Sequence, residues 1–103
     1  MGLLSILGLG TVAVSGVSME PTLRSGDWLL VTTAQPSHLS PGKLYVIERD
    51  EQPGVLFIKR LQKSHGRLHW FEGDNPASTD SREWGWVEEH CVRGKVLFRY
   101  KRA

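Results

Sequence analysis

Short runs of apolar and β-branched residues, broken at close intervals by glycine and proline, constrain the fold of this chain most strongly. Turn-forming sequences such as Ser40-Pro41-Gly42 and Gly73-Asp74-Asn75-Pro76 separate the runs. Residues of these types favour the tight turns that join neighbouring strands. The sequence therefore predicts a mostly β fold, a small antiparallel sandwich or barrel. The expected strands cover residues 11–14, 28–32, 43–48, 55–61, 67–71 and 95–100, with one helical turn expected at 86–91.

Length and charge bound the organisation and the partners. A chain of 103 residues has room for one modest hydrophobic core, so we expect a single domain over residues 1–103. A formal charge of +2 is too small to predict a nucleic-acid partner. The basic residues near the C-terminus are interpreted as a solvated chain end.

Cysteine and histidine usage predicts neither a disulfide nor a metal. Cys91 is the only cysteine, so an internal disulfide is impossible and a reducing compartment fits. On a strand, His90 and Cys91 would point to opposite faces, which argues against a catalytic Cys/His pair. The other histidines lack metal-binding spacing. We expect no cofactor and no structural metal.

The most apolar stretch covers residues 1–14. It has fourteen residues, three of them glycine, whereas a spanning helix needs about 20 apolar residues. No basic residue precedes it, as one would in a signal peptide. We interpret residues 1–13 as an apolar segment leading into a catalytic core at 14–103. Contact with a membrane surface is left open, a spanning helix is not expected, and the expected location is cytoplasmic, with membrane association as the alternative.

Ser18 is a candidate nucleophile because of its neighbours. A glycine-containing bend precedes it and a proline turn follows it. Such a bend can lift a hydroxyl from the line of a strand and leave backbone N–H groups free to form an oxyanion hole. A serine beside a glycine is, on its own, usually an ordinary turn residue.

Lys59 is a candidate general base. Alternation along the strand expected at residues 55–61 places it on the same face as Phe57 and Leu61. If that face is inward, loss of water lowers the pKa of the amine, and a neutral amine can accept a serine proton. The alternative is an edge lysine that extends into solvent.

A polar loop at residues 73–82 is the third feature. Dense Asp, Asn and Ser residues usually tie a loop together through local turns. Asp80 and Arg82 can pair within such a loop, and Ser78 can instead orient an amine. Residue chemistry alone does not choose between these uses.

In order and content, the three segments resemble the type I signal peptidases and their relatives, which use a Ser/Lys dyad. The matching residues are 15–23 with Gly26-Asp27, then 57–60, then 73–87. The resemblance implies the β fold of signal peptidases and repressor-type proteases. It also implies that Ser18 attacks the scissile carbonyl and that Lys59 is the general base and later the general acid.

The same resemblance implies supporting roles for nearby residues. Ser78 would hold the lysine amine, and Asp80 and Arg82 would brace the site. The oxyanion hole would use the Ser18 N–H, with Gly16 at the position where some relatives place a serine hydroxyl.

Two residues that follow the serine would contact the substrate by the same resemblance. Met19 and Pro21 are expected to line the pocket for the residue before the cut.

Departures from the family pattern narrow the expected substrate. Residues 61–66 stand where membrane signal peptidases usually carry Gly-Leu-Pro-Gly-Asp, and a second β domain is not inserted. The chain is more similar to the short proteases that mature nickel-type superoxide dismutase. We therefore expect a serine endopeptidase that removes an N-terminal extension from a precursor protein, bound as an extended peptide in a groove.

Three alternatives stay open. The first is a membrane-associated signal peptidase acting on exported preproteins, which the apolar residues before Val14 favour. The second is a self-cleaving protease of the repressor type. The third is a catalytically inactive β domain that binds a partner.

Overall fold

We describe a computed structural model of the chain, in which residues 8–103 are placed. A short helix, α2 (Ser81–Trp84), and a 3₁₀ turn, η1 (Glu89–Cys91), accompany seven strands. The strands are β1 (Leu9–Ala13), β2 (Trp28–Thr32), β3 (Leu44–Ile47), β4 (Phe57–His65), β5 (Leu68–Glu72), β6 (Val87–Glu88) and β7 (Val92–Lys101).

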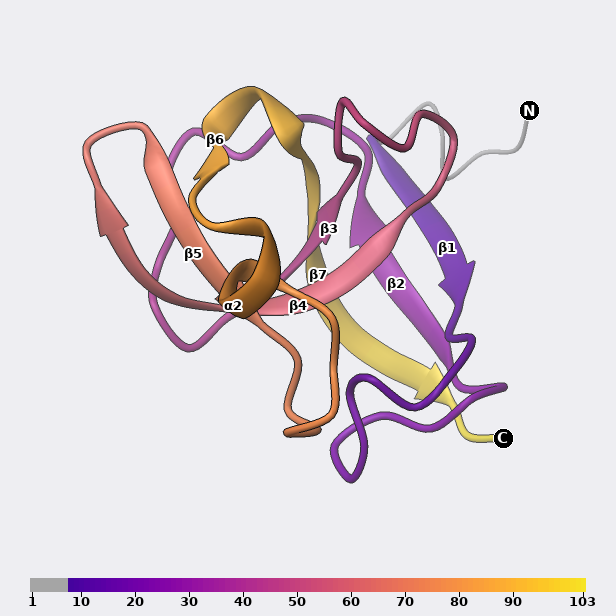
Figure 1. The fold of residues 1–103 in the computed structure, drawn as a ribbon. Helices are drawn as coiled ribbons and strands as arrows, with labels where there is room; N and C mark the ends of the chain where they lie inside the picture. Colours follow the sequence, from indigo (N-terminus) through magenta and orange to yellow (C-terminus); the bar gives the residue numbers. More distant parts are fainter. Residues whose placement is uncertain (1–7) are drawn as a thin grey trace.

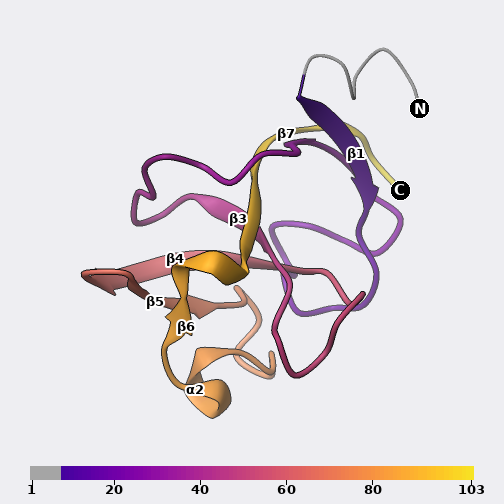
Figure 2. The same ribbon diagram turned by 90° about the horizontal axis from the view of Figure 1, so that it is seen from above.

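All neighbouring strands are antiparallel, in the order β1-β2-β7-β3-β4-β5-β6. The sheet curves into a half-barrel, with β1 and β2 at one end and β5 and β6 at the other (Figure 1). The long strand β7 pairs with β2 along one part and with β3 along another, so it connects the two halves (Figure 2). The predicted mostly β, antiparallel fold is confirmed.

The predicted strand at 28–32 matches β2, and the others agree with an observed strand to within four residues at each end. The helical turn predicted at 86–91 is wrong in its first part, because Val87 and Glu88 pair with β5 as strand β6. Only residues 89–91 are helical. Helix α2 was not predicted.

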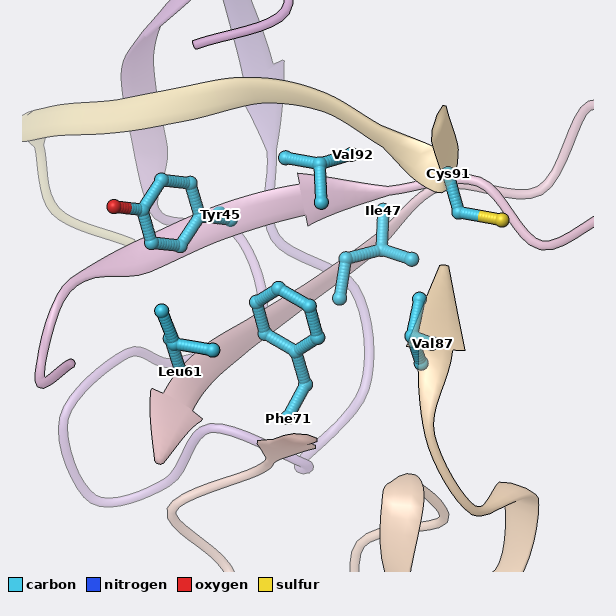
Figure 3. Packing of buried hydrophobic residues seen from close by; sticks show 7 residues of the cluster. All are labelled: Tyr45, Ile47, Leu61, Phe71, Val87, Cys91 and Val92. Carbon is cyan, nitrogen blue, oxygen red and sulfur yellow. The ribbon is translucent and has the colours of Figure 1, made fainter. Parts of the chain in front are cut away.

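Two hydrophobic clusters fill the interior. Alternate residues of β3 point to opposite sides, so Tyr45 and Ile47 enter one cluster and Val46 enters the other. In the first cluster, Tyr45 packs edge-on against Phe71, with ring centroids 6.0 Å apart (Figure 3). Fully burying side chains of this size contributes about 1.5–3 kcal/mol each. The first cluster comprises Tyr45, Ile47, Leu61, Phe71, Val87, Cys91 and Val92.

The second cluster anchors the connection between β1 and β2, which contains the candidate nucleophile. Met19 and Leu23 of this connection are buried in the cluster with Val14. The ends of the connection are tied by two backbone hydrogen bonds of 2.8 Å, from Val14 N to Asp27 O and from Gly26 N to Val14 O. The connection is therefore held against the sheet by both packing and hydrogen bonds.

The apolar segment predicted at residues 1–13 is described only in part. Residues 1–7 lie outside the described residues, and Leu9–Ala13 form strand β1, which pairs with β2. Within residues 8–103, no helix is long and apolar enough to cross a membrane.

Candidate active site

The three predicted segments meet at one groove of about 450 Å³. The lining comes from the β1–β2 connection, from residues at and just before the start of β4, and from the loop between β5 and α2. Ser18, Lys59 and Ser78 all line this groove. The full lining consists of Ser15, Gly16, Val17, Ser18, Val55, Leu56, Phe57, Lys59, Ala77, Ser78 and Thr79.

Lys59 is 2% exposed and lies on the same face of β4 as Leu61 of the first hydrophobic cluster. Strand β4 lies between β3 and β5, and Lys59 pairs with Tyr45 in register. Its Nζ donates a hydrogen bond of 2.9 Å to Ser78 Oγ. In the described part of the chain, no carboxylate forms an ion pair with this ammonium. The alternative of an edge lysine in solvent is therefore wrong.

The surroundings of Lys59 favour the neutral amine. Burial is the main cause that lowers its pKa, the negative charge of Asp80 opposes this by raising it, and the positive charge of Arg82 lowers it further. The rings of Phe57 and Trp84 lie 5.8 and 5.9 Å from Nζ, near the outer limit of a cation–π contact. The net effect is a pKa below the ordinary lysine value.

The backbone around Ser18 is fixed by the loop after β5. Asn75 donates its backbone N–H to Ser18 O and its side-chain amide to Val17 O, both at 3.0 Å. Gly73 packs so closely that a Cβ there would collide with Ser18 O and with the side chain of Ser78. This glycine therefore sets the separation of the two serines.

The hydroxyl and the amine face the same groove without a direct bond. Among the hydrogen bonds of residues 8–103, none joins Ser18 Oγ to Lys59 Nζ, and none is donated by the Ser18 N–H. Gly16, at φ +81°, makes the bend that leads to Ser18. A free N–H beside a candidate nucleophile is the donor that an oxyanion hole requires.

Asp80 organises the loop behind Lys59. Its carboxylate is fully buried and accepts hydrogen bonds from Gly73 N at 2.7 Å and from Arg82 N, Nε and Nη2 at 3.1, 2.9 and 2.6 Å. Burial raises the pKa of Asp80, but these bonds, with a smaller contribution from Ser78, outweigh it and hold the pKa below its usual range. Asp80 also caps helix α2. The predicted pairing of Asp80 with Arg82 is present in the structure.

A second charged clamp was missed by the sequence analysis. Arg60, beside Lys59 on β4, donates two hydrogen bonds of 2.9 and 2.7 Å to Asp74. The Thr22 hydroxyl donates to the same carboxylate, so the clamp joins β4 to the loop that carries Ser18. Alternation places Arg60 on the face of β4 opposite to Lys59, but it does not indicate Asp74 as the partner.

A smaller cavity of about 120 Å³ adjoins Ser18. Met19 lines this cavity and is 1% exposed, so its side chain is held in place by packing. Leu56 and Phe57 also line the cavity. Pro21 lines neither this cavity nor the groove and is exposed, so the structure does not bring it to the site with Met19.

Another polar row lies away from the groove. Ser64 Oγ lies 2.7 Å from His69 Nδ1, and His69 Nε2 lies 3.1 Å from Glu89 Oε1. The row has the residue types of a catalytic triad, but Ser64 lines neither cavity beside Ser18. Ser64 and His69 face each other across β4 and β5. We interpret the row as a tie between this hairpin and the turn η1.

His90 and Cys91 were expected to point to opposite faces only if they lie on a strand, and they do not. These residues lie in the 3₁₀ turn η1 rather than on a strand, and Cys91 Sγ lies 3.6 Å from His90 Nε2. Burial raises the pKa of the Cys91 thiol, which makes it a weak nucleophile. The pair does not compete with Ser18 as a candidate nucleophile.

Comparison with known proteins places the chain in a peptidase family. The model of the Peptidase S24-like family matches residues 8–96, so the chain belongs to this family. The chain is also similar to mitochondrial inner membrane protease subunit 1. It is 33% identical to the Xenopus tropicalis protein, with 88% of this chain and 69% of that protein covered. For the human and mouse proteins the identities are 27% and 29%, with 87% of this chain and 68% of each protein covered.

Proposed function

We propose that this protein is a serine endopeptidase in which Ser18 is the nucleophile and Lys59 the general base. The observation that supports this most directly is the state of Lys59. A buried ammonium without a carboxylate partner lines the same groove as Ser18 and has a lowered pKa. Burial of an unpaired charge is costly, so such a lysine is more stable when neutral.

The proposed reaction has two halves. Neutral Lys59 takes the hydroxyl proton as Ser18 Oγ bonds to the scissile carbonyl carbon, and the resulting ammonium gives that proton to the departing amine. A water molecule then attacks the acyl carbon and gives one proton to Lys59, and the Ser18–acyl bond breaks as Lys59 passes that proton to Ser18 Oγ. The free Ser18 N–H is positioned to stabilise the oxyanion in both halves.

Supporting residues position these groups in this scheme. Ser78 holds Lys59 Nζ at 2.9 Å, which keeps the amine at the groove rather than along the strand. Asp80 and Arg82 hold the loop that presents Ser78, as Arg82 Nη2 also reaches the carbonyls of Gly73 and Asn75 at 3.4 and 3.3 Å. We therefore treat Ser78, Asp80 and Arg82 as positioning residues.

The shape of the site supports a peptide substrate. A groove of about 450 Å³ beside a pocket of about 120 Å³ suits an extended chain with one small side chain inserted next to the cut. Val17, Val55 and Leu56 are exposed along the groove and offer apolar contact to such a chain. We propose that the substrate is the N-terminal extension of a precursor protein.

The finer proposal is that the precursor is a nickel-type superoxide dismutase and that processing is cytoplasmic. It is supported by the resemblance to the short dismutase-maturing proteases. The competing candidate is an exported or organellar preprotein cleaved at a membrane, which the similarity to mitochondrial inner membrane protease subunit 1 favours. Release of the protein from membranes by salt alone would speak against an inserted anchor.

The test is cleavage of a panel containing the dismutase precursor and signal-peptide precursors, with the new N-terminus read by mass spectrometry. The wild-type protein is expected to cut one site, and Ser18→Ala and Lys59→Ala are expected to abolish the cut. Lys63→Ala is the matched control, since Lys63 lies exposed on the same strand. Cleavage that persists in Ser18→Ala would overturn the nucleophile assignment. Binding of a precursor without cleavage by any folded form would favour the inactive binding domain.

A further inference from the structure

Away from the groove, three side chains with metal-binding atoms converge at the surface. Asp50 contributes a carboxylate oxygen, His90 a ring nitrogen and Cys91 its sulfur, and these atoms all lie within 4.8 Å of one another. We propose that they bind one divalent metal ion of borderline softness, Zn²⁺ in the first place. A mixed set of thiolate, imidazole and carboxylate suits Zn²⁺ and does not suit Mg²⁺ or Ca²⁺, which prefer oxygen ligands.

The distances fit tetrahedral coordination with small movement. Zn–S bonds of about 2.3 Å and Zn–N bonds of about 2.0 Å place the two ligand atoms about 3.5 Å apart. Cys91 Sγ and His90 Nε2 are 3.6 Å apart. His90 Nε2 and Asp50 Oδ2 are 2.7 Å apart, where about 3.3 Å is required. Asp50 is 63% exposed, so its side chain is free to make this shift.

A second carboxylate lies beside His90. Glu88 Oε2 is 3.1 Å from Nδ1, the ring nitrogen that does not contact Asp50 or Cys91. A carboxylate near the distal nitrogen is the usual outer partner of a metal-bound histidine.

The scaffold holds the two contributing segments together. Glu48 N donates to Cys91 O at 2.9 Å, and Arg93 donates to His90 O and to Glu48 Oε1, both at 3.1 Å. The backbone on both sides of the site is thus fixed before any ion binds. A cavity of about 400 Å³ that Asp50, Glu88 and Cys91 help to line gives the ion access, and water can occupy the fourth position.

Binding deprotonates Cys91, whose proton passes to solvent as the sulfur–metal bond forms. It also adds a link between η1 and the loop from β3 to β4, which carries Asp50. We therefore expect Zn²⁺ to raise the melting temperature of the protein. The sequence predicted no structural metal because the other histidines lack metal-binding spacing, and Asp50 lies 40 residues from His90.

The test is titration of Zn²⁺ into the reduced, chelator-treated full chain by calorimetry. One ion per chain is expected. Asp50→Asn and His90→Ala alter exposed side chains and should each weaken binding at least about tenfold, and Glu88→Gln about 10–100-fold. Glu51→Gln, the neighbouring exposed carboxylate, is the matched control and should bind like the wild type. With Co²⁺, a thiolate-to-metal absorption band should appear and be absent in Cys91→Ser.

Equal Zn²⁺ affinity in the wild type and His90→Ala, or no binding by the folded wild type, would overturn the proposal and leave a Glu88–His90–Asp50 ion pair. Because the readout is metal binding, either result is independent of the proposed peptidase activity. Weak binding that also persists in Asp50→Asn would indicate adventitious surface histidine binding and would count against the site.

Discussion

Asp27 and Lys59 are both buried, each 2% exposed. The surroundings of Asp27 stabilise its charged form, whereas those of Lys59 favour its neutral form. Asp27 accepts hydrogen bonds from Arg24 N at 2.9 Å, from Ala103 N at 2.8 Å and from Arg99 Nη1 at 3.1 Å. The backbone bonds from Arg24 and Ala103 are the main causes that lower the pKa of Asp27 to about 2. The Asp27 carboxylate thereby links the C-terminus to the β1–β2 connection.

Lys59 has one neutral partner, the Ser78 hydroxyl, and its pKa moves toward the uncharged form because of burial. The comparison shows that burial alone does not define a role. A buried charge surrounded by donors stabilises the fold, whereas a buried amine that lacks a counter-charge beside a groove is suited to accept a proton.

The largest effect is expected from replacing the lysine. Lys59→Met keeps the length of the side chain and removes the base, so cleavage should fall by about 10³-fold or more, near the upper end of general-base contributions. The melting temperature should stay the same or rise, since an apolar side chain suits the buried position. Thermal denaturation and cleavage rates measured together check both statements. A clear loss of stability would mean that Lys59 is a structural residue like Asp27.

Gly73→Ala should come next. The added Cβ forces apart Ser18 O and Ser78, and misplacing reacting groups by about 1 Å can cost about 10²-fold in rate. The expected result is a fall in kcat with the fold retained by circular dichroism. Gly66→Ala is the comparison for backbone strain away from the groove, because Gly66 has φ +60° but open space around it, so this variant should lose stability without a fall in kcat. Unchanged kcat in Gly73→Ala would show that the separation of the two serines is not critical.

Asp27→Asn should show the reverse pattern. It removes a charge that three donors depend on, so the melting temperature should drop while the activity of the folded fraction stays near that of the wild type. Because the folded pKa of about 2 is below the ordinary value of 3.8, the stabilisation is present above about pH 4 and is lost as the pH falls toward 2. The melting temperatures of Asp27→Asn and the wild type should therefore converge as the pH falls over that range. A difference in melting temperature that stays constant with pH would contradict this role.

The smallest effect is expected at the pocket. Met19→Phe adds bulk to the wall of a 120 Å³ cavity, so preference should move toward smaller side chains before the cut, by a few-fold in kcat/KM. A peptide library varied at that position measures the change. Pro21→Ala is the control, because Pro21 lines neither cavity. Identical preferences in Met19→Phe and the wild type would remove Met19 from the substrate pocket.

Sequence patterns predicted most of the fold because strands and turns leave local signals. The strand predicted at residues 28–32 has the same first and last residues as β2. The short helix at 81–84 was missed although Asp80 and Glu83 stand at the spacing of a capping box, because four residues carry no hydrophobic period. The turn at 89–91 depends on how the chain leaves β6 to enter β7, which is a tertiary effect.

Of the residues predicted for the site, Ser18, Lys59 and Ser78 line one groove, whereas Pro21 lies away from it. Alternation indicated the face of Lys59, but its burial depends on which segments cover that face in the folded chain, and this is not a local property. The Arg60–Asp74 clamp and the close approach at Gly73 join segments far apart in the chain, so no spacing rule reveals them.

The measurement that bears most directly on the proposed mechanism is the titration of Lys59 itself. Carbon-13 labelling at lysine Cε, with the Lys59 signal assigned by its absence in Lys59→Arg, gives the amine pKa by NMR. We predict that Lys59 titrates below the ordinary value of 10.5, and that kcat/KM rises with pH through the same midpoint. A Lys59 that titrates at the ordinary value, or activity that is flat across its titration, would contradict the assignment of Lys59 as the general base.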